Sequence, residues 1–205
     1  IIRSIMNPKV MLSMVESSRN LFATASEYHK IVEKVNAVIE NNRVGHQIEK
    51  YEKSRIFSCV RGADNGYAPT SLNRLKNIML YVLERCGEVW YTKMNKLLFY
   101  IDFVSYRERG TAMTGLAYKA ISYGPVPDRW DKIYSEFSEI TQELCPAGEY
   151  TGSVLIATAK ANEGLFVEAE LYIMDRICAN MGAYSSRKLS DLSHQEEAWK
   201  NYLNN

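Results

Sequence analysis

The sequence has few cysteines, and none are arranged as metal ligands usually are. The four cysteines lie far apart, without a Cys-x-x-Cys pair or a neighbouring histidine (Cys59, Cys86, Cys145 and Cys178). Zinc sites and disulfide-stapled scaffolds both rely on characteristic cysteine spacings. These absences argue against a zinc site and against a secreted disulfide framework. We therefore expect buried free thiols in a cytoplasmic protein, and no metal.

The sequence also lacks an excess of charge of either sign. Its formal net charge is +1, which argues against strong nucleic-acid or membrane-surface binding. It contains neither an apolar run long enough to span a bilayer nor a signal peptide. With 205 residues, 46% of them hydrophobic, it fits one large globular domain or one domain with a smaller appendage.

The first third of the sequence is patterned as two helices. Pro8 fits the first turn of one helix, with Asn7 as its cap and an end near Ser18. Apolar residues at helical spacing, separated by Glu and Lys, predict a second helix over residues 26–40. The turn-forming residues at 41–45 are expected to end it.

Three stronger helical patterns follow. Residues 72–86 place apolar side chains on one face, after Thr70 or Ser71 as a cap. Residues 92–109 are apolar nearly all round at their centre, which indicates a helix buried inside the domain. Residues 167–181 repeat the one-faced pattern.

Two lysines at the start of the 92–109 helix raise the question of a phosphate site. Such a site needs a glycine-rich loop with free amides, and none lies near Lys93 or Lys96. We therefore expect both ammonium groups to be solvated at the helix entrance.

Two segments have strand-like composition. Residues 116–123 alternate loosely, and residues 153–160 are their expected antiparallel partner, because a lone strand cannot satisfy its backbone groups. The predicted fold class is α+β: a mainly helical domain with a small inserted antiparallel sheet, preceded by an N-terminal helical segment. We place a helical segment or linker at residues 1–65 and the main domain at residues 70–205.

A stiff stretch, YGPVPDRW, begins at Tyr123. Pro125 and Pro127 fix two φ angles, and Gly124 allows a backbone conformation closed to other residues. Asp128 is a candidate cap for a following helix. One interpretation is a corner in the fold; the other is a docking surface that loses little entropy when a partner binds. In the second case Tyr118, Tyr123 and Trp130 are typical interface anchors.

Asp102 is the one acidic residue in the apolar centre of the 92–109 helix. A buried carboxylate needs donors. Three roles stay open: a structural one, in which Asp102 caps a loop or pairs with a base such as Arg129; projection into a partner-binding cleft; or acid catalysis. Catalysis ranks last, because no second carboxylate or nucleophile is paired with it in the sequence.

The segment Ser193-His194-Gln195-Glu196 near the end of the chain has the pattern of a helix start. Ser193 would cap the helix, with Glu196 at the third position as in a capping box. We prefer this interpretation to a metal site, because His194 and Glu197 alone are too few ligands. A hydrogen bond from His194 to Asp102 is an additional expectation.

Three segments in this order resemble the SocA-like antitoxin, or Panacea, domain. They are KLLFYIDF, TGLAYKAISYGPVPDRWDKIY and LSDLSHQEEAW, within residues 70–205. The resemblance implies an antitoxin that binds and inactivates a co-encoded protein toxin, without a cofactor and without catalysis. The structural motif residues would be Ser193, His194, Glu196 and Trp199. The partner-binding residues would be Asp102, Tyr118, Tyr123, Gly124, Pro125, Val126, Pro127 and Trp130.

Other functions remain as alternatives. The chain begins at Ile1, inside a helix-like segment without a start signal, so we expect that a further segment precedes it. If that segment is a DNA-binding module, this chain would be the sensing or dimerising half of a transcriptional regulator. A second copy of the chain is a further candidate partner, whereas a membrane is not. A hydrolase using Asp102 or His194 is the least favoured alternative.

Overall fold

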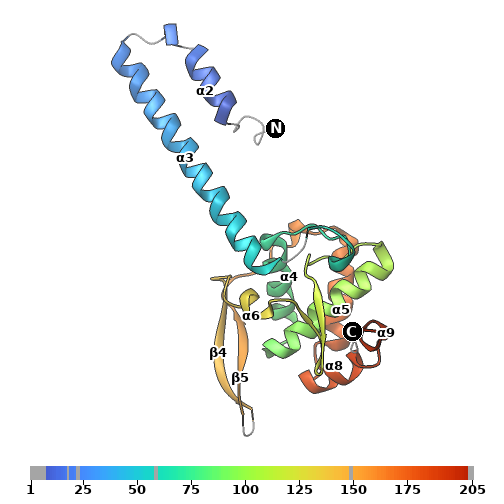
Figure 1. Cartoon of the computed structure of the whole chain (residues 1–205). Coiled ribbons are helices and arrows are strands. Elements are labelled where there is room, and N and C mark those ends of the chain that lie inside the picture. Colours follow the sequence, from blue (N-terminus) through green and yellow to red (C-terminus); the bar gives the residue numbers. More distant parts are fainter. Residues whose placement is uncertain (1–7, 18, 22–23, 58–59, 148–149, 203–205) are drawn as a thin grey trace. The chain divides into compact units, whose positions relative to one another are not determined.

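The computed structural model describes residues 8–17, 19–21, 24–57, 60–147 and 150–202, and the chain divides into two compact units. Unit 1, Ile1–Tyr51, contains α2 (Pro8–Ser17), η1 (Arg19–Leu21) and most of α3 (Ala25–Ile56) (Figure 1). The extent predicted for α2 is confirmed, but Asn7 lies outside the described residues. The predicted end of the next helix at 41–45 is wrong. The asparagines and the glycine there cost at most about 1 kcal/mol each, and no proline interrupts the segment.

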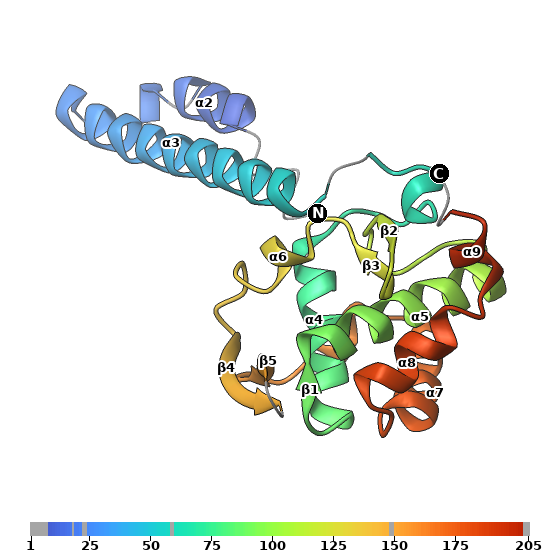
Figure 2. The same ribbon diagram turned by 60° about the horizontal axis from the view of Figure 1, so that its bottom comes forward.

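Unit 2, Glu52–Asn205, is built around three helices that the sequence predicted. They are α4 (Leu72–Arg85), α5 (Tyr91–Arg109) and α7 (Glu168–Met181). Ser71 caps α4 by accepting a hydrogen bond from the amide of Arg74. Helix α5 contacts α4, α7 and α8 (Ser186–Ser193), and Figure 2 shows it running through the middle of the unit. Its predicted burial is confirmed.

The strands form two separate antiparallel groups. Strands β1 (Val89–Trp90), β5 (Tyr150–Ala157) and β4 (Ile140–Ala147) form a sheet in that order. Strands β2 (Tyr118–Ile121) and β3 (Gly124–Pro127) form a hairpin of their own. The α+β class is confirmed, but the predicted pairing of residues 116–123 with 153–160 is wrong. The proline stretch is itself the partner, because proline favours extended backbone at and before its own position.

Short elements complete unit 2: η2 (Ala63–Asn65), α6 (Trp130–Ile133), η3 (Glu163–Leu165) and α9 (Glu197–Lys200). The prediction that Asp128 caps α6 is wrong. Arg129 occupies the cap position with φ 63°, and Asp128 forms an ion pair with Lys119 at 2.6 Å. In the described part of the chain, no helix combines the length and apolar character needed to cross a membrane.

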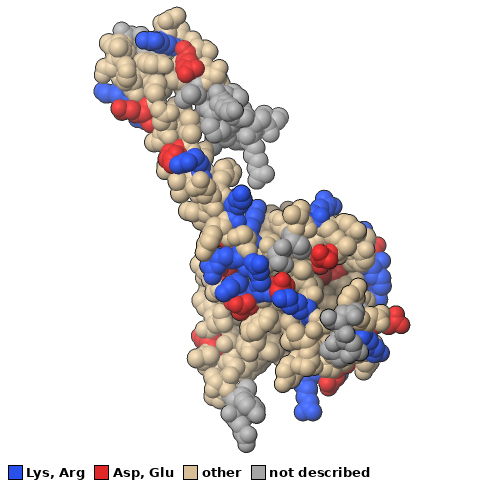
Figure 3. Space-filling view, viewed as in Figure 1, with Lys and Arg blue, Asp and Glu red and all other residues tan. Residues whose placement is uncertain are grey.

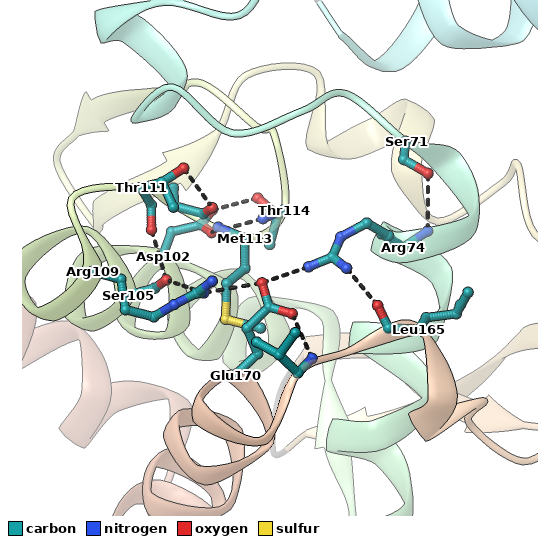
Figure 4. A network of polar contacts seen from close by, with 12 residues as sticks. Ser71, Arg74, Asp102, Ser105, Arg109, Thr111, Met113, Thr114, Leu165 and Glu170 are labelled. Carbon is teal, nitrogen blue, oxygen red and sulfur yellow. Dashed lines mark hydrogen bonds and ion pairs between the residues drawn. The ribbon is translucent and has the colours of Figure 1, made fainter.

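A cluster of ion pairs around the buried carboxylate of Glu170 joins α4, α5 and α7 (Figure 4). The Glu170 carboxylate is 2.8 Å from the guanidinium of Arg74 and 3.0 Å from that of Arg109, and it accepts a hydrogen bond from the Val167 amide. Burial alone would raise the pKa of Glu170, but these partners hold it below its usual range. The cluster therefore stabilises the scaffold in its ionised form.

Candidate partner-binding site

A cavity of about 700 Å³ lies between α5, the β2–β3 hairpin and α8. Its walls combine aromatic and aliphatic side chains with a few polar groups. The lining residues are Tyr91, Thr92, Asn95, Lys96, Ile121, Ser122, Tyr123, Val126, Trp130, Ser186, Arg187, Ser190, Asp191 and His194. All belong to unit 2, so the cavity is formed within one compact body.

Lys96 lies in the wall of this cavity, and the expectation that it is solvated is wrong. Its side chain is only 4% exposed, and its ammonium donates to the carbonyl oxygen of Pro125 at 2.7 Å. Burial lowers the pKa of Lys96 to about 8. Lys93 is buried too, and donates to the carbonyl oxygens of Cys86 and Glu88. Both lysines are enclosed because α5 is covered by other elements on more than one side.

Gly124 permits the hairpin to approach Lys96 closely. Its φ is +92°, and a Cβ atom added there would lie 2.3 Å from Ser193 Oγ and 2.7 Å from Lys96 Nζ. The conformation expected for Gly124 is therefore present. Ser190 Oγ donates to the carbonyl oxygen of Tyr123 at 2.7 Å, which joins the hairpin turn to α8. The hairpin that forms this wall of the cavity is thus held against both α5 and α8.

Two aromatic side chains of the predicted partner-binding set are exposed at the cavity. Tyr123 is 76% exposed and Trp130 is 37% exposed. The Trp130 ring stacks on Tyr91 with a centroid distance of 5.4 Å and an interplanar angle of 3°. Pro125 and Pro127 are buried in β3, and Val126 is a buried part of the cavity lining.

Asp102 is buried away from the cavity lining. Its carboxylate accepts hydrogen bonds from the amides of Met113 and Thr114, from the Thr114 hydroxyl and from the Tyr118 hydroxyl. Burial raises the pKa of Asp102, although these four hydrogen bonds oppose the rise. The suggested pairing with Arg129 is wrong, because that guanidinium donates to the Ser54 carbonyl. The other structural role, capping of a loop, is confirmed, because Asp102 accepts the Met113 and Thr114 amides of the segment after α5.

The capping box predicted at Ser193 and Glu196 is also wrong. Ser193 is the last residue of α8 and donates to the Ser190 carbonyl, while Glu196 precedes α9 without a side-chain capping bond. His194 stacks on Trp199 at 4.2 Å, and its Nε2 atom is buried without a hydrogen-bond partner among the described residues. The predicted hydrogen bond from His194 to Asp102 is wrong, because the Asp102 carboxylate accepts from Met113, Thr114 and Tyr118 instead. His194 instead lines the cavity.

The comparison with known families matches residues 94–200 to the description "Antitoxin SocA-like, Panacea domain". That range is just over half of the chain and runs from α5 to α9. The chain belongs to the SocA-like Panacea domain family. Membership in this antitoxin-like family implies a toxin-binding role in general terms. Neither a curated protein nor a solved structure matches the chain.

The Panacea match contains most of the cavity lining, including Lys96, the hairpin and His194. Sequence reasoning missed Lys96, Asn95 and Ser190 as site residues. One available signal was Lys96 directly before an apolar run, on a helix predicted to be buried. Among the described residues, no three His, Cys, Asp or Glu side chains gather as metal ligands would. The cavity instead offers nitrogen donors within apolar walls.

Proposed function

We propose that this chain is an antitoxin that neutralises a co-encoded protein toxin by direct binding, and that its Panacea domain acts without catalysis. The family supports the general role. The observation that carries the specific proposal is the cavity between the hairpin and α8, with Tyr123 and Trp130 exposed at it. Aromatic side chains around a concave surface are typical of the residues that dominate binding energy.

The hairpin is well suited to binding because it is already held in place. Its backbone is fixed by two prolines, and it is joined to α8 by Ser190 and to α9 by the indole N–H of Trp199, which donates to the Ile121 carbonyl at 3.0 Å. A surface ordered before binding loses less conformational entropy when the partner arrives. A toxin would therefore meet a preformed site.

Basic side chains extend the same region. A second hollow shares Trp130, Ile121 and Val126 with the cavity and is also lined by Arg55, Lys119, Arg129 and Lys132. Asp128 and Asp131 lie among them, and Figure 3 shows such mixed groups of basic and acidic side chains on the surface. Charges of this kind influence the association rate and specificity more than the affinity.

The test is co-expression with the product of the adjacent open reading frame. We expect rescue of growth and co-elution of the two proteins on a sizing column. Tyr123→Ala and Trp130→Ala should each weaken the complex by about tenfold or more, as truncated anchor residues do. Tyr172→Ala, at an exposed tyrosine of α7 outside the cavity, is the matched control. A neighbour that is harmless alone and does not co-elute would contradict the proposal.

A further inference from the structure

Lys96 carries a charge that the described part of the protein does not neutralise. Its ammonium has three donors, and the one hydrogen bond found for it goes to a neutral carbonyl. It forms no ion pair with any described carboxylate. Buried charges in proteins are normally paired, because removing an ion from water is costly. Asp191, the carboxylate in the cavity lining, is exposed to water and forms no ion pair with Lys96.

Further hydrogen-bonding capacity is unused in the same cavity. Asn95 Oδ1 accepts a hydrogen bond from the Tyr134 hydroxyl at 2.6 Å, and its amide NH₂ has no partner among the described residues. The Nε2 atom of His194 is buried and has no hydrogen-bond partner among the described residues. Around these groups lie the apolar surfaces of Tyr91, Val126 and Trp130. The arrangement is complementary to an anionic acceptor on an apolar stem.

Building on the proposed function, we infer that the toxin inserts an acidic side chain into this cavity, where its carboxylate pairs with Lys96. The hydrocarbon part of that side chain and its apolar neighbours pack on Tyr91 and Trp130. A carboxylate supplies the missing counter-charge, which a neutral side chain cannot do, and its two oxygens accept charge-assisted hydrogen bonds. Lys96 is then a specificity determinant for toxins that present a carboxylate at this point.

This pairing links toxin binding to pH. Free Lys96, with its pKa lowered to about 8, loses its proton above that pH and must regain it to pair with a carboxylate. The affinity should therefore fall by up to about tenfold per pH unit above pH 8. The other titratable groups lining the cavity are Tyr91 on α5, Tyr123 in the hairpin turn, Arg187 and Asp191 on α8, and His194 directly after α8.

The first experiment measures the dissociation constant of the complex with the adjacent gene product at about pH 7 and about pH 9. Lys96→Met should weaken binding at least about tenfold at the lower pH. In this variant the affinity should no longer fall between the lower and the higher pH. Lys93→Met is the matched control: it removes a buried lysine one turn earlier on α5, outside the cavity lining. Unchanged affinity in Lys96→Met, or an equal loss in both variants, would overturn the inference.

A second experiment does not need the toxin, so it separates this inference from the proposed function. Hexanoate and hexanamide in the millimolar range are titrated into the full chain, and the side-chain NMR signal of Trp130 is followed. Hexanoate should shift the signal in the wild type but not in Lys96→Met, and hexanamide should have little effect. Equal responses to both probes would overturn the inference. So would hexanoate binding together with unchanged toxin binding in Lys96→Met, since the cavity would then serve a small carboxylate.

Discussion

Position 124 requires glycine for two reasons, the backbone conformation and the lack of space for a side chain. Its left-handed φ disfavours any residue with a Cβ atom, and the space that this atom would occupy is taken by Ser193 Oγ and Lys96 Nζ. The glycine therefore determines how near β3 comes to α5 and α8. It also positions the Pro125 carbonyl that accepts the hydrogen bond from Lys96.

We expect Gly124→Ala to lower the free energy of unfolding by about 3 kcal/mol, from backbone strain together with overpacking. Gly87→Ala is the control, because Gly87 also has a positive φ, +61°, but a Cβ atom added there would have no neighbour within 4 Å. That substitution should cost about 1 kcal/mol from the backbone conformation alone. Urea unfolding of both variants measures the difference. Equal losses of free energy of unfolding in the two variants would show that the close contacts with Ser193 and Lys96 do not contribute to the cost of Gly124→Ala.

At the scale of elements, the helices were predictable and the hairpin was not. Helices α4, α5 and α7 follow from apolar periodicity, because each buries one face or more in the same core. The pairing of β2 with β3 is different: prolines usually argue against strands, and the two residues between the strands are not a typical hairpin turn sequence. The packing of β3 on α5 and α8, which favours that pairing, is not visible in the sequence.

The candidate site was predicted in part for the same reason. Tyr123 and Trp130 stand out in the sequence as aromatic residues beside a stiff stretch, and both line the cavity. Lys96 was misread because the sequence does not show which face of α5 the hairpin covers. Burial of a lysine depends on tertiary neighbours far along the chain, here Pro125 and Ser193. The spacing of apolar residues indicates that a helix is buried, but it does not indicate which elements cover each charged residue of that helix.

The cluster around Glu170 makes a prediction about how the helices are held together. Glu170→Gln should lower the free energy of unfolding by about 2 kcal/mol at neutral pH, because it leaves two half-buried guanidinium groups without their counter-ion. The pKa of Glu170 is lowered from 4.5 in the folded protein, so its contribution is fully present above that pH and is lost as the pH falls through the lower folded-state pKa. The difference in free energy of unfolding between the variant and the wild type should therefore become smaller at acidic pH.

Chemical denaturation as a function of pH measures this dependence. Glu108→Gln is the control, because Glu108 pairs with Arg176 in a partly exposed ion pair between α5 and α7. Ion pairs that water reaches contribute little to stability, so this variant should behave nearly as the wild type does. A large and equal effect of both substitutions would contradict a special role for the buried cluster.

At the scale of the whole molecule, the two units differ in how much they bury. Among the described residues from Ser13 to Tyr51, no side chain is fully buried, whereas α5 alone buries twelve. The buried residue of α3 is Ile56, which belongs to unit 2. Because burial of apolar surface is the main favourable term in folding, unit 2 contains the cooperative core and unit 1 opens at a lower free energy.

This difference predicts the outcome of limited trypsin digestion under native conditions. Cleavage should begin in unit 1, after Lys30, Lys34, Arg43 or Lys50, at least about tenfold faster than in unit 2, because local opening there needs little free energy. Mass spectrometry should identify a resistant fragment that starts near Glu52, and circular dichroism should show that it stays folded. Since every cavity residue lies between Tyr91 and His194, the fragment should still co-elute with the toxin. A first cut beyond residue 60, or a fragment that folds but no longer binds, would contradict the assignment of both stability and binding to unit 2.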